Sequence, residues 1–591
     1  MKKLLTGNEA VALGAYEAGV TIASAYPGTP STEILENIAQ YDEIYSEWAT
    51  NEKVALEVAI GASIAGARSV AAMKHVGVNV AADPLFTFTY TGVNGGCVLV
   101  SADDPGMHSS QNEQDNRYYA KFAKIPMLEP SDSQESKDFM KIAYEISEEY
   151  DTPVLLRLTT RVCHGKGLVE IGERKEVEFK EYKKDIPKYV ATPANARKRR
   201  VILEERLKRL EQLSNSSDLN KIEWNDKKIG IITSGVAYQY AKEVFGDKAS
   251  FLKLGFTFPL PKAKIKEFAD QVEKLYIIEE LEPYIEDEIK ALSIDVIGKE
   301  VIPAIGELNP DILQEALLGI KADKVDISVE KVVPRPPTMC AGCPHRGLFY
   351  VLSKKKNTVV TGDIGCYTLG SAPPLESMDT CICMGASISA GHGFTKALEK
   401  KGQETKVFGV IGDSTFFHSG ITGLVNAVYN KGNAATIILD NRITGMTGHQ
   451  ENPGTGYTLS GDNTEYIDIV KICEAIGVKN ISVINPLDLK ESEEAVSKAM
   501  NTKEPMVIIA KWPCVLKKSP KEEVEEFGLD KRIKCTVDRE KCRKCKMCLK
   551  AGCPAISFDP SIGSIIDESM CVGCDVCLQI CPFKAIVKAG E

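Results

Sequence analysis

Two runs of closely spaced cysteines dominate the C-terminal end of this chain. The first run reads Cys542-x2-Cys545-x2-Cys548-x4-Cys553-Pro554, and the second reads Cys571-x2-Cys574-x2-Cys577-x3-Cys581-Pro582. In a reducing compartment, cysteines at such spacing are metal ligands rather than disulfide partners. Paired C-x2-C units alone would also suit two structural zinc sites, but zinc would not explain the proline that follows each run. The tail is therefore expected to be a small metal-binding module.

The tandem runs resemble those of bacterial two-cluster ferredoxins, in which thiolates hold [4Fe-4S] clusters and the fourth cysteine of each run binds the other cluster. The resemblance implies two sets of ligands. One set is Cys542, Cys545, Cys548 and Cys581, and the other is Cys571, Cys574, Cys577 and Cys553. This chain has four residues before Cys553 where the bacterial pattern has three, so the loop at that cluster is expected to differ.

The charge pattern excludes several classes of partner. The chain of 591 residues has 72 Lys and Arg against 82 Asp and Glu, a formal net charge of −10, and no run of five or six basic residues. It therefore lacks the electrostatic pattern of a protein that binds nucleic acid or an anionic membrane. No apolar stretch approaches about 20 residues and the N-terminus has no signal-peptide pattern, so we expect no membrane segment and a cytoplasmic location.

Amphipathic helices alternate with short apolar strands, which predicts an α/β protein with parallel sheets. Several domains are expected, because one core stops growing at about 250–300 residues. We expect an α/β domain at 1–175, a charged linker with one exposed helix at 176–227, a second α/β domain at 228–333, a third at 334–530, and the cysteine-rich tail at 534–591. The proline-rich break at 334–337 marks the start of the third domain.

Polar residues follow two buried strands of the third domain. Gly412-Asp413-Ser414 follows the strand expected at 407–411, and Asn441 follows shortly after the strand expected at 436–439. Mg2+ prefers oxygen ligands of this kind beside phosphate oxygens, and neighbouring parallel strands present such loops at one edge of a sheet. A Gly-Asp pair alone would be more typical of a plain loop. The two loops together predict a site for a metal and a diphosphate.

These loops resemble the Gly-Asp-Gly…Asn signature of thiamine diphosphate enzymes. The resemblance implies that Asp413 and Asn441 bind Mg2+ through their side chains and Ile443 through its carbonyl, and that Gly412 lies beside the diphosphate. Ser414 replaces the usual third glycine, so it is expected to tighten the turn or to hydrogen-bond the diphosphate.

Thiamine chemistry also needs a buried glutamate that holds N1′ of the aminopyrimidine. The segment from residue 51 to 68 resembles the glutamate helix of pyrimidine-binding domains, and its register to Gly61 implies Glu52 rather than Glu57. The alternative is an exposed helix carboxylate. Met384 and Gly385 look like the segment that lies against the cofactor rings in relatives.

A thiamine site and a ferredoxin-like tail on one chain resemble the 2-oxoacid:ferredoxin oxidoreductases, and the order of parts matches their indolepyruvate branch. The turn at 25–31 is similar to the family's Tyr-Pro-x-Thr-Pro-Ser turn, in which the threonine, here Thr29, touches substrate and cofactor. The resemblance implies doubly wound thiamine diphosphate domains, a transketolase C-terminal-like α/β domain and the ferredoxin-like tail.

The family's activity implies oxidative decarboxylation of indolepyruvate and other aryl 2-oxo acids, through a thiamine diphosphate enamine, to aryl-acetyl-CoA and carbon dioxide. Ferredoxin would accept the electrons, and coenzyme A would accept the acyl group. The cofactors would be thiamine diphosphate, Mg2+ and two [4Fe-4S] clusters. A smaller beta subunit is expected, in a hetero-oligomer.

The substrate pocket departs from that of the pyruvate enzymes, which have an arginine for the substrate carboxylate. This chain has Asp103 and Asp104 in the corresponding segment, and an acidic pair cannot replace an arginine. We expect a bulkier substrate, with His75 and His108 in its pocket, although a lone histidine is more often structural. The alternatives are a pyruvate or 2-oxoglutarate enzyme, or an electron-transfer subunit with vestigial thiamine domains.

Four further cysteines resemble ligand segments of the pyruvate enzymes, whose proximal cluster lies between thiamine and the distal pair. They are Cys340, Cys343, Cys366 and Cys514. The resemblance implies a third, proximal [4Fe-4S] cluster. Buried cysteines that serve only as small fillers are the alternative.

Overall fold

A computed structural model of the chain describes residues 1–321 and 336–590. The first of these ranges belongs to one compact unit and the second to another, and each unit is described by itself. The expected boundary at 333, with Pro334 and Arg335 of the proline-rich break, lies outside the described residues. Among the helices of the described residues, none is both long and apolar enough to cross a bilayer.

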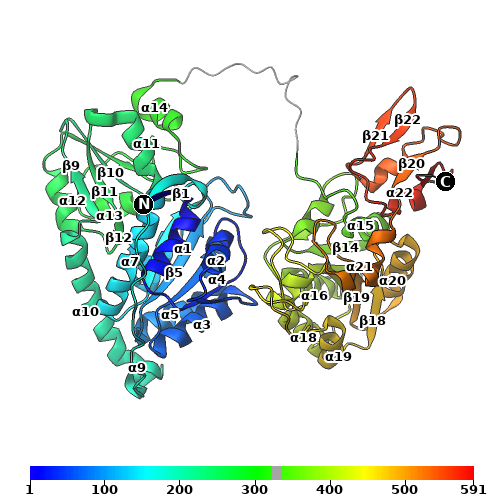
Figure 1. The fold of residues 1–591 in the computed structure, drawn as a ribbon, viewed down its shortest axis with the longest axis horizontal. Coiled ribbons are helices and arrows are strands. Elements are labelled where there is room, and N and C mark those ends of the chain that lie inside the picture. Colours follow the sequence, from blue (N-terminus) through cyan, green and yellow to red (C-terminus); the bar gives the residue numbers. More distant parts are fainter. Residues whose placement is uncertain (322–335, 591) are drawn as a thin grey trace. The chain divides into compact units, whose positions relative to one another are not determined.

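The first unit is built on a seven-stranded sheet of order β12-β6-β7-β5-β4-β2-β3, in which all strands except β12 run parallel (Figure 1). The parallel arrangement confirms the βαβ prediction. Its strands are β2 (Ile22–Ala25), β3 (Tyr45–Trp48), β4 (Ser69–Lys74), β5 (Cys97–Asp103), β6 (Met127–Leu128), β7 (Val154–Thr159) and β12 (Phe256–Phe258). A two-stranded antiparallel ribbon joins β1 (Lys2–Thr6) to β8 (Lys166–Glu170).

A second sheet of the first unit has four strands in the order β13-β10-β11-β9, with only β9 antiparallel. Its strands are β9 (Asn220–Glu223), β10 (Ile229–Ser234), β11 (Ser250–Leu254) and β13 (Lys274–Ile278). The chain leaves β11 and adds β12 to the edge of the seven-stranded sheet. The part expected as a separate domain at 228–333 therefore contributes a strand to the first sheet.

Helices connect these strands. They are α1 (Gly7–Glu17), α2 (Thr32–Ile38), α3 (Glu52–Ile64), α4 (His75–Val80), α5 (Ala82–Thr91), α6 (Arg117–Ala123), α7 (Ser133–Tyr150), α8 (Thr160–His164), α9 (Ile186–Tyr189), α10 (Pro193–Ser216), α11 (Gly235–Phe245), α12 (Lys262–Ala269), α13 (Tyr284–Lys290) and α14 (Pro310–Leu318). The helix expected in the linker forms as α10, but it is not simply exposed, because Leu203 and Leu210 are fully buried.

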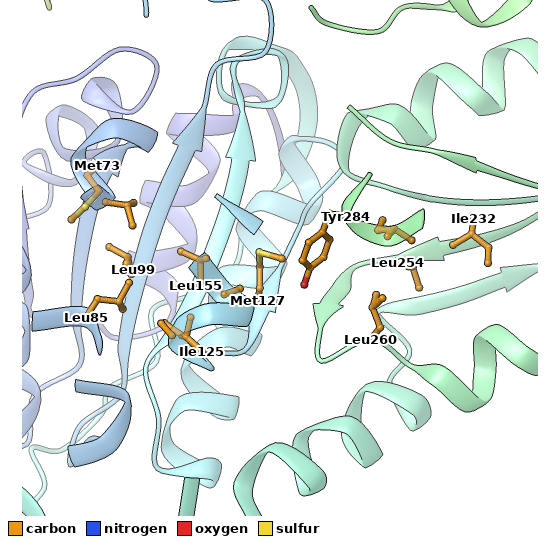
Figure 2. Close-up of a cluster of buried hydrophobic side chains, with 14 of the residues drawn as sticks. Met73, Leu85, Leu99, Ile125, Met127, Leu155, Ile232, Leu254, Leu260 and Tyr284 are labelled. Atoms are coloured by element: carbon orange, nitrogen blue, oxygen red, sulfur yellow. The ribbon is translucent and has the colours of Figure 1, made fainter. Parts of the chain in front are cut away.

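One hydrophobic core runs through the first unit from one sheet to the other. It contains Leu99 of β5 and Leu155 of β7 together with Ile232 of β10. Figure 2 shows Tyr284 between Met127 of the first sheet on one side and Leu254 and Leu260 on the other. Burial of apolar area contributes about 25 cal/mol per Å2, so this shared core holds the two sheets together.

The second unit contains a six-stranded parallel sheet of order β15-β14-β16-β17-β19-β18. Its strands are β14 (Thr358–Gly362), β15 (Thr380–Cys381), β16 (Lys406–Gly412), β17 (Ala435–Asp440), β18 (Asn480–Ile484) and β19 (Met506–Lys511). Its helices are α15 (His345–Leu352), α16 (Ala386–Lys400), α17 (Asp413–Thr415), α18 (Ile421–Tyr429), α19 (Ile469–Ile476), α20 (Leu489–Asn501) and α21 (Lys521–Phe527). The strands expected at 407–411 and 436–439 are present as parts of β16 and β17.

The cysteine-rich tail forms a small module on the second unit (Figure 1). It has two antiparallel ribbons and one short helix. These are β20 (Cys535–Val537) paired with β23 (Ile586–Lys588), β21 (Ile556–Asp559) paired with β22 (Gly563–Ile566), and α22 (Val576–Ile580).

A buried ion network links the two sheets of the first unit. The Arg117 guanidinium is 1% exposed and donates to Asp115, to Glu279 at 2.5 Å and to the Glu280 carbonyl at 2.8 Å. Glu279 follows β13 of the second sheet, whereas Arg117 begins α6. A buried carboxylate without a counter-ion is strongly unfavourable. Asp115 and Glu279 therefore need the Arg117 guanidinium as their counter-ion.

Arg117→Met should therefore lower the stability of the first unit by about 3–5 kcal/mol, because two buried carboxylates lose their counter-charge. Chemical denaturation followed by circular dichroism measures the change. Lys121→Met is the matched control, since Lys121 pairs with Glu288 across the same two segments but is 53% exposed. The control should lose less than about 1 kcal/mol. Equal losses in the two variants would contradict the assignment.

Candidate functional site

The two loops predicted to bind a metal lie at the carboxyl ends of two neighbouring strands of the second unit. Strands β16 and β17 pair in parallel with Gly412 opposite Leu439, so Asp413 and Asn441 emerge at the same edge of the sheet. Asp413 begins α17 and is 2% exposed. Its Oδ2 accepts a hydrogen bond from Asn452 Nδ2 at 3.1 Å. Sequence reasoning missed Asn452, which comes from a distant loop without a motif of its own.

The electrostatics of Asp413 suit a cation. Burial, and after it the neighbouring Asp440 carboxylate, raises the pKa of Asp413 to about 8. A divalent cation at the loop would stabilise the charged carboxylate that these surroundings disfavour. The residues present therefore fit the predicted metal.

The remaining residues of the two loops are held by local contacts. Ile443 is buried, and its N–H donates to Asn441 Oδ1 at 3.2 Å. The Ser414 hydroxyl accepts from Thr444 Oγ1 at 2.9 Å, so the serine that replaces the third glycine ties the two loops together.

The Met384-Gly385 turn is fixed by a buried carboxylate. Gly385 has φ +85° and precedes α16, and a Cβ there would lie 2.5 Å from Ser419 Cβ, so a glycine is required. Asp363, at the end of β14, accepts from the N–H of Gly385 at 3.0 Å and of Ser387 at 3.1 Å. An acidic group at a helix N-terminus stabilises that end of the helix. Asp363 therefore positions the turn.

Four of the cysteines outside the tail, those predicted to hold a proximal cluster, influence one another. Burial raises the pKa of Cys366 to about 11, and the thiols of Cys514 and Cys340 add to the rise. The same two thiols act on Cys343. The group adjoins the metal loop, because the Cys514 N–H donates to the Asn441 carbonyl at 2.9 Å.

The structure brings together the four cysteines of the first predicted set and three of the second. One cavity is lined by all four cysteines of the first set, which are Cys542, Cys545, Cys548 and Cys581. In the second set, Cys574 and Cys577 both interact with Cys553. Cys535, which sequence reasoning did not single out, donates its N–H to the Cys571 sulfur at 3.4 Å. Among the described residues, no three His, Cys, Asp or Glu side chains form a metal-binding geometry, so ligation stays a prediction.

The first unit presents its predicted residues from four adjacent strands. Thr29 follows β2, Glu52 follows β3, His75 follows β4 and His108 follows β5, and these strands are consecutive in the sheet. Parallel pairing puts the four loops at one edge. The predicted residues thus share one side of the unit.

Glu52 and Glu57 have different surroundings on α3. Glu52 is 5% exposed, and a Cβ on Gly77 would lie 2.6 Å from its Cγ. Glu57 is exposed and pairs with Lys53. Only Glu52 has the burial that the pyrimidine role requires, so the register argument is supported and its role stays a prediction.

The two predicted histidines differ as well. His75 is fully buried beside Asn112 at 3.2 Å, and burial, followed by the Lys74 ammonium, lowers its pKa to about 4. His108 is exposed and bonds Glu307 at 3.1 Å. Neither arrangement indicates a substrate contact, and both assignments stay untested.

Lys74, which the sequence reasoning did not select, lies against the turn that contains Thr29. It is 8% exposed, and its Cβ is 3.0 Å from the Cβ position of Gly28. Burial lowers its pKa to about 8. The carboxylates of Asp103 and Asp104 have partners within the protein. Arg157 binds Asp103 at 2.9 Å, and Asp104 accepts a hydrogen bond from the Ser109 N–H at 2.8 Å.

Comparison with known proteins agrees with the expected kinds of domain. Residues 13–225 match a family described as "Pyruvate flavodoxin/ferredoxin oxidoreductase, thiamine diP-bdg", 363–510 match "Thiamine pyrophosphate enzyme, C-terminal TPP binding domain", and 564–587 match "4Fe-4S binding domain". These matches confirm the predicted thiamine diphosphate domains and the iron-sulfur tail as kinds of domain.

Curated relatives match over the whole chain. "Indolepyruvate oxidoreductase subunit IorA" of Archaeoglobus fulgidus is 43% identical over 100% of this chain and 98% of its own length. The protein of that name from Pyrococcus horikoshii is 41% identical over 100% and 97%. "2-oxoglutarate synthase subunit KorA" of Methanothermobacter marburgensis is 25% identical over 54% of this chain and 98% of its own. The chain therefore belongs to the family of the indolepyruvate oxidoreductase subunit IorA.

Proposed function

We propose that this chain oxidises indolepyruvate and other aryl 2-oxo acids to aryl-acetyl-CoA and carbon dioxide, and passes the electrons to ferredoxin. A smaller beta subunit would complete a hetero-oligomer, and coenzyme A would take the acyl group. The observation that supports the proposal is the contact between the buried Asp413–Asn441 loops and a group of four cysteines, because a predicted diphosphate site would then lie beside the predicted cluster ligands. The full-length match to IorA proteins supports the substrate class.

The anaerobic complex should turn over indolepyruvate and phenylpyruvate with kcat/KM at least about 10-fold above that for pyruvate or 2-oxoglutarate, because a pocket for an aryl group gains apolar contacts that small acids lack. Coenzyme A-dependent reduction of methyl viologen measures the rates. A preference for pyruvate or 2-oxoglutarate would favour the other branches. Protein purified without thiamine diphosphate, and inactive when it is added, would instead indicate vestigial thiamine domains.

Each unit has its own residues with a proposed role toward thiamine diphosphate. Asp413 and Asn441, with the carbonyl of Ile443, would hold Mg2+ on the diphosphate. Thiamine diphosphate, when bound, supplies a nucleophilic carbon that also acts as an electron sink. Glu52 would hold a proton at N1′ of the pyrimidine, and Thr29 would face the substrate.

Glu52→Gln should lower turnover by about 10²- to 10⁴-fold, the usual contribution of a positioned acid or base, while bound thiamine diphosphate is retained. Glu57→Gln on the same helix is the control and should have little effect. Gly77→Ala should reduce turnover too, because its Cβ would displace the Glu52 side chain. Gly61→Ala should not, since a Cβ there meets nothing within 4 Å. Stopped turnover in both glutamine variants, or in neither, would contradict the role of Glu52.

A third, proximal [4Fe-4S] cluster on Cys340, Cys343, Cys366 and Cys514 is part of the proposal. The mutual interaction of these thiols supports it, and so does their contact with the Asn441 loop. Small buried cysteines that merely fill space would not need to gather in this way.

Iron and acid-labile sulfide should reach about twelve atoms each per chain, as three [4Fe-4S] clusters require. Cys366→Ala should lower both to about eight. Cys473→Ala is the control, because Cys473 is a fully buried cysteine of α19 in the same unit. About eight atoms in the unmodified protein would exclude the third cluster.

A further inference from the structure

The first cysteine run is surrounded by basic side chains. Five of the ten residues from 541 to 550 are Lys or Arg and none is acidic, although the chain as a whole has a net charge of −10. We call the exposed cations beside the first cysteine set the basic rim. It consists of Lys541, Arg543, Lys544, Lys546, Lys550 and Lys584. Cys545 is itself exposed among them.

The rim borders the cavity of the first cysteine set. Arg543 lines that cavity together with Cys545 and Phe583, which is 47% exposed. A cluster held there would lie close to the surface and within reach of a docked protein. The apolar Phe583 next to cations is typical of a surface that binds a protein partner.

The second cysteine set has the opposite environment. Cys574 and Val576 pack in the same hydrophobic cluster as Cys343. The Cβ position of Gly342, between Cys340 and Cys343, meets the Val572 side chain directly. The second set therefore lies against the proximal cysteines.

A buried arginine fixes this contact. Arg346 is 2% exposed, and its Nη2 donates to the carbonyls of Met339 at 2.6 Å and Cys340 at 2.9 Å. Its Nη1 donates to the carbonyls of Ala551 at 2.9 Å and Gly552 at 2.5 Å. One guanidinium thus joins the Cys340 loop to the loop that ends in Cys553, a cysteine of the second set.

Charge also distinguishes the first cysteine run from the rest of the tail. Residues 551–590 contain four acidic residues and two basic ones, a net charge of −2. The positive charge is therefore local to the first set. A cationic patch accelerates association with an anionic partner, and the effect decreases as salt rises.

We infer that electrons leave this protein at the first cysteine set, and that the basic rim docks an acidic one-electron carrier protein there. The inference rests on the proposed function, because it requires clusters on both tail sets. Electrons would pass from the proximal cysteines to the second set and then to the first. Each docked carrier would be reduced by one electron and a cluster on the first set would be oxidised by one, so two carriers would be reduced for each 2-oxo acid oxidised.

Three of the six rim cations have contacts within the tail and are therefore not used in the test. Lys541 pairs with Asp538, Lys544 donates to the Ser561 carbonyl, and the Lys546 ammonium lies 4.6 Å from the Phe558 ring centre. In contrast, Arg543, Lys550 and Lys584 form no salt bridge with any other residue of the described ranges. Their replacement should change the charge of the rim without loss of local structure.

The assembled enzyme carrying Arg543→Glu, Lys550→Glu and Lys584→Glu is compared with wild type, with an acidic two-cluster ferredoxin or methyl viologen as acceptor. The KM for ferredoxin should rise at least about 10-fold at low salt and lose most of its salt dependence. The methyl viologen rate should stay within about twofold, because a small dye needs no docking surface.

The matched control reverses three exposed lysines of the same unit outside the tail, as Lys400→Glu, Lys401→Glu and Lys503→Glu. It should leave the KM for ferredoxin unchanged. An equal rise in the control would attribute the effect to net charge and overturn the inference. An unchanged KM in the rim variant would overturn it as well.

Two further outcomes are decisive. If the rim variant no longer copurifies with the beta subunit, the rim is a subunit interface and the inference fails. If the triple variant loses iron, the single variants Arg543→Gln, Lys550→Gln and Lys584→Gln replace it, and an unchanged KM in all three overturns the inference. A wild-type enzyme that reduces neither acceptor would contradict the proposed function itself.

Discussion

Parallel pairing between neighbouring strands determines where chemistry can take place in both units. In a parallel sheet all strands end at one edge, and the residues that follow them meet there whatever their separation in sequence. Thr29 and Glu52 meet this condition in the first unit, as Asp413 and Asn441 do in the second. The predicted cofactor residues are therefore adjacent because of strand order, and the loops need only supply the right side chains.

Buried charge then fixes the loops that the strands present. Arg117 joins the two sheets of the first unit, Asp363 holds the N-terminus of α16, and Arg346 holds the tail. Each of these charged groups forms several hydrogen bonds, as burial requires, although Arg346 Nε has no hydrogen-bond partner among the described residues. Burial raises the pKa of both Asp363 and Asp413, but Asp413 also has the Asp440 carboxylate beside it, so its surroundings favour a cation more strongly.

The contacts of the second unit form a continuous series from the metal loop to the tail. The Asn441 carbonyl binds the N–H of Cys514, the thiols of Cys514 and Cys343 interact, and the loop at Gly342 packs on the tail. Short separations matter because the transfer of an electron between two centres becomes slower as their separation increases. The tail is thus attached by the same segment that would hold the proximal cluster, which keeps that separation fixed.

Local patterns in the sequence determined much of this protein. The strand rhythm predicted parallel sheets, because that rhythm depends on short-range geometry, and the resemblance of the tail cysteines to those of two-cluster ferredoxins implied two sets of ligands. The register of α3 selected Glu52, whose burial agrees with that choice. Only the tertiary structure placed β12 in the first sheet, brought Asn452 to Asp413 and put Arg346 between two cysteine loops. These contacts join residues far apart in sequence, and such pairs leave no periodic or spaced pattern because their partners are chosen by packing after the elements have formed.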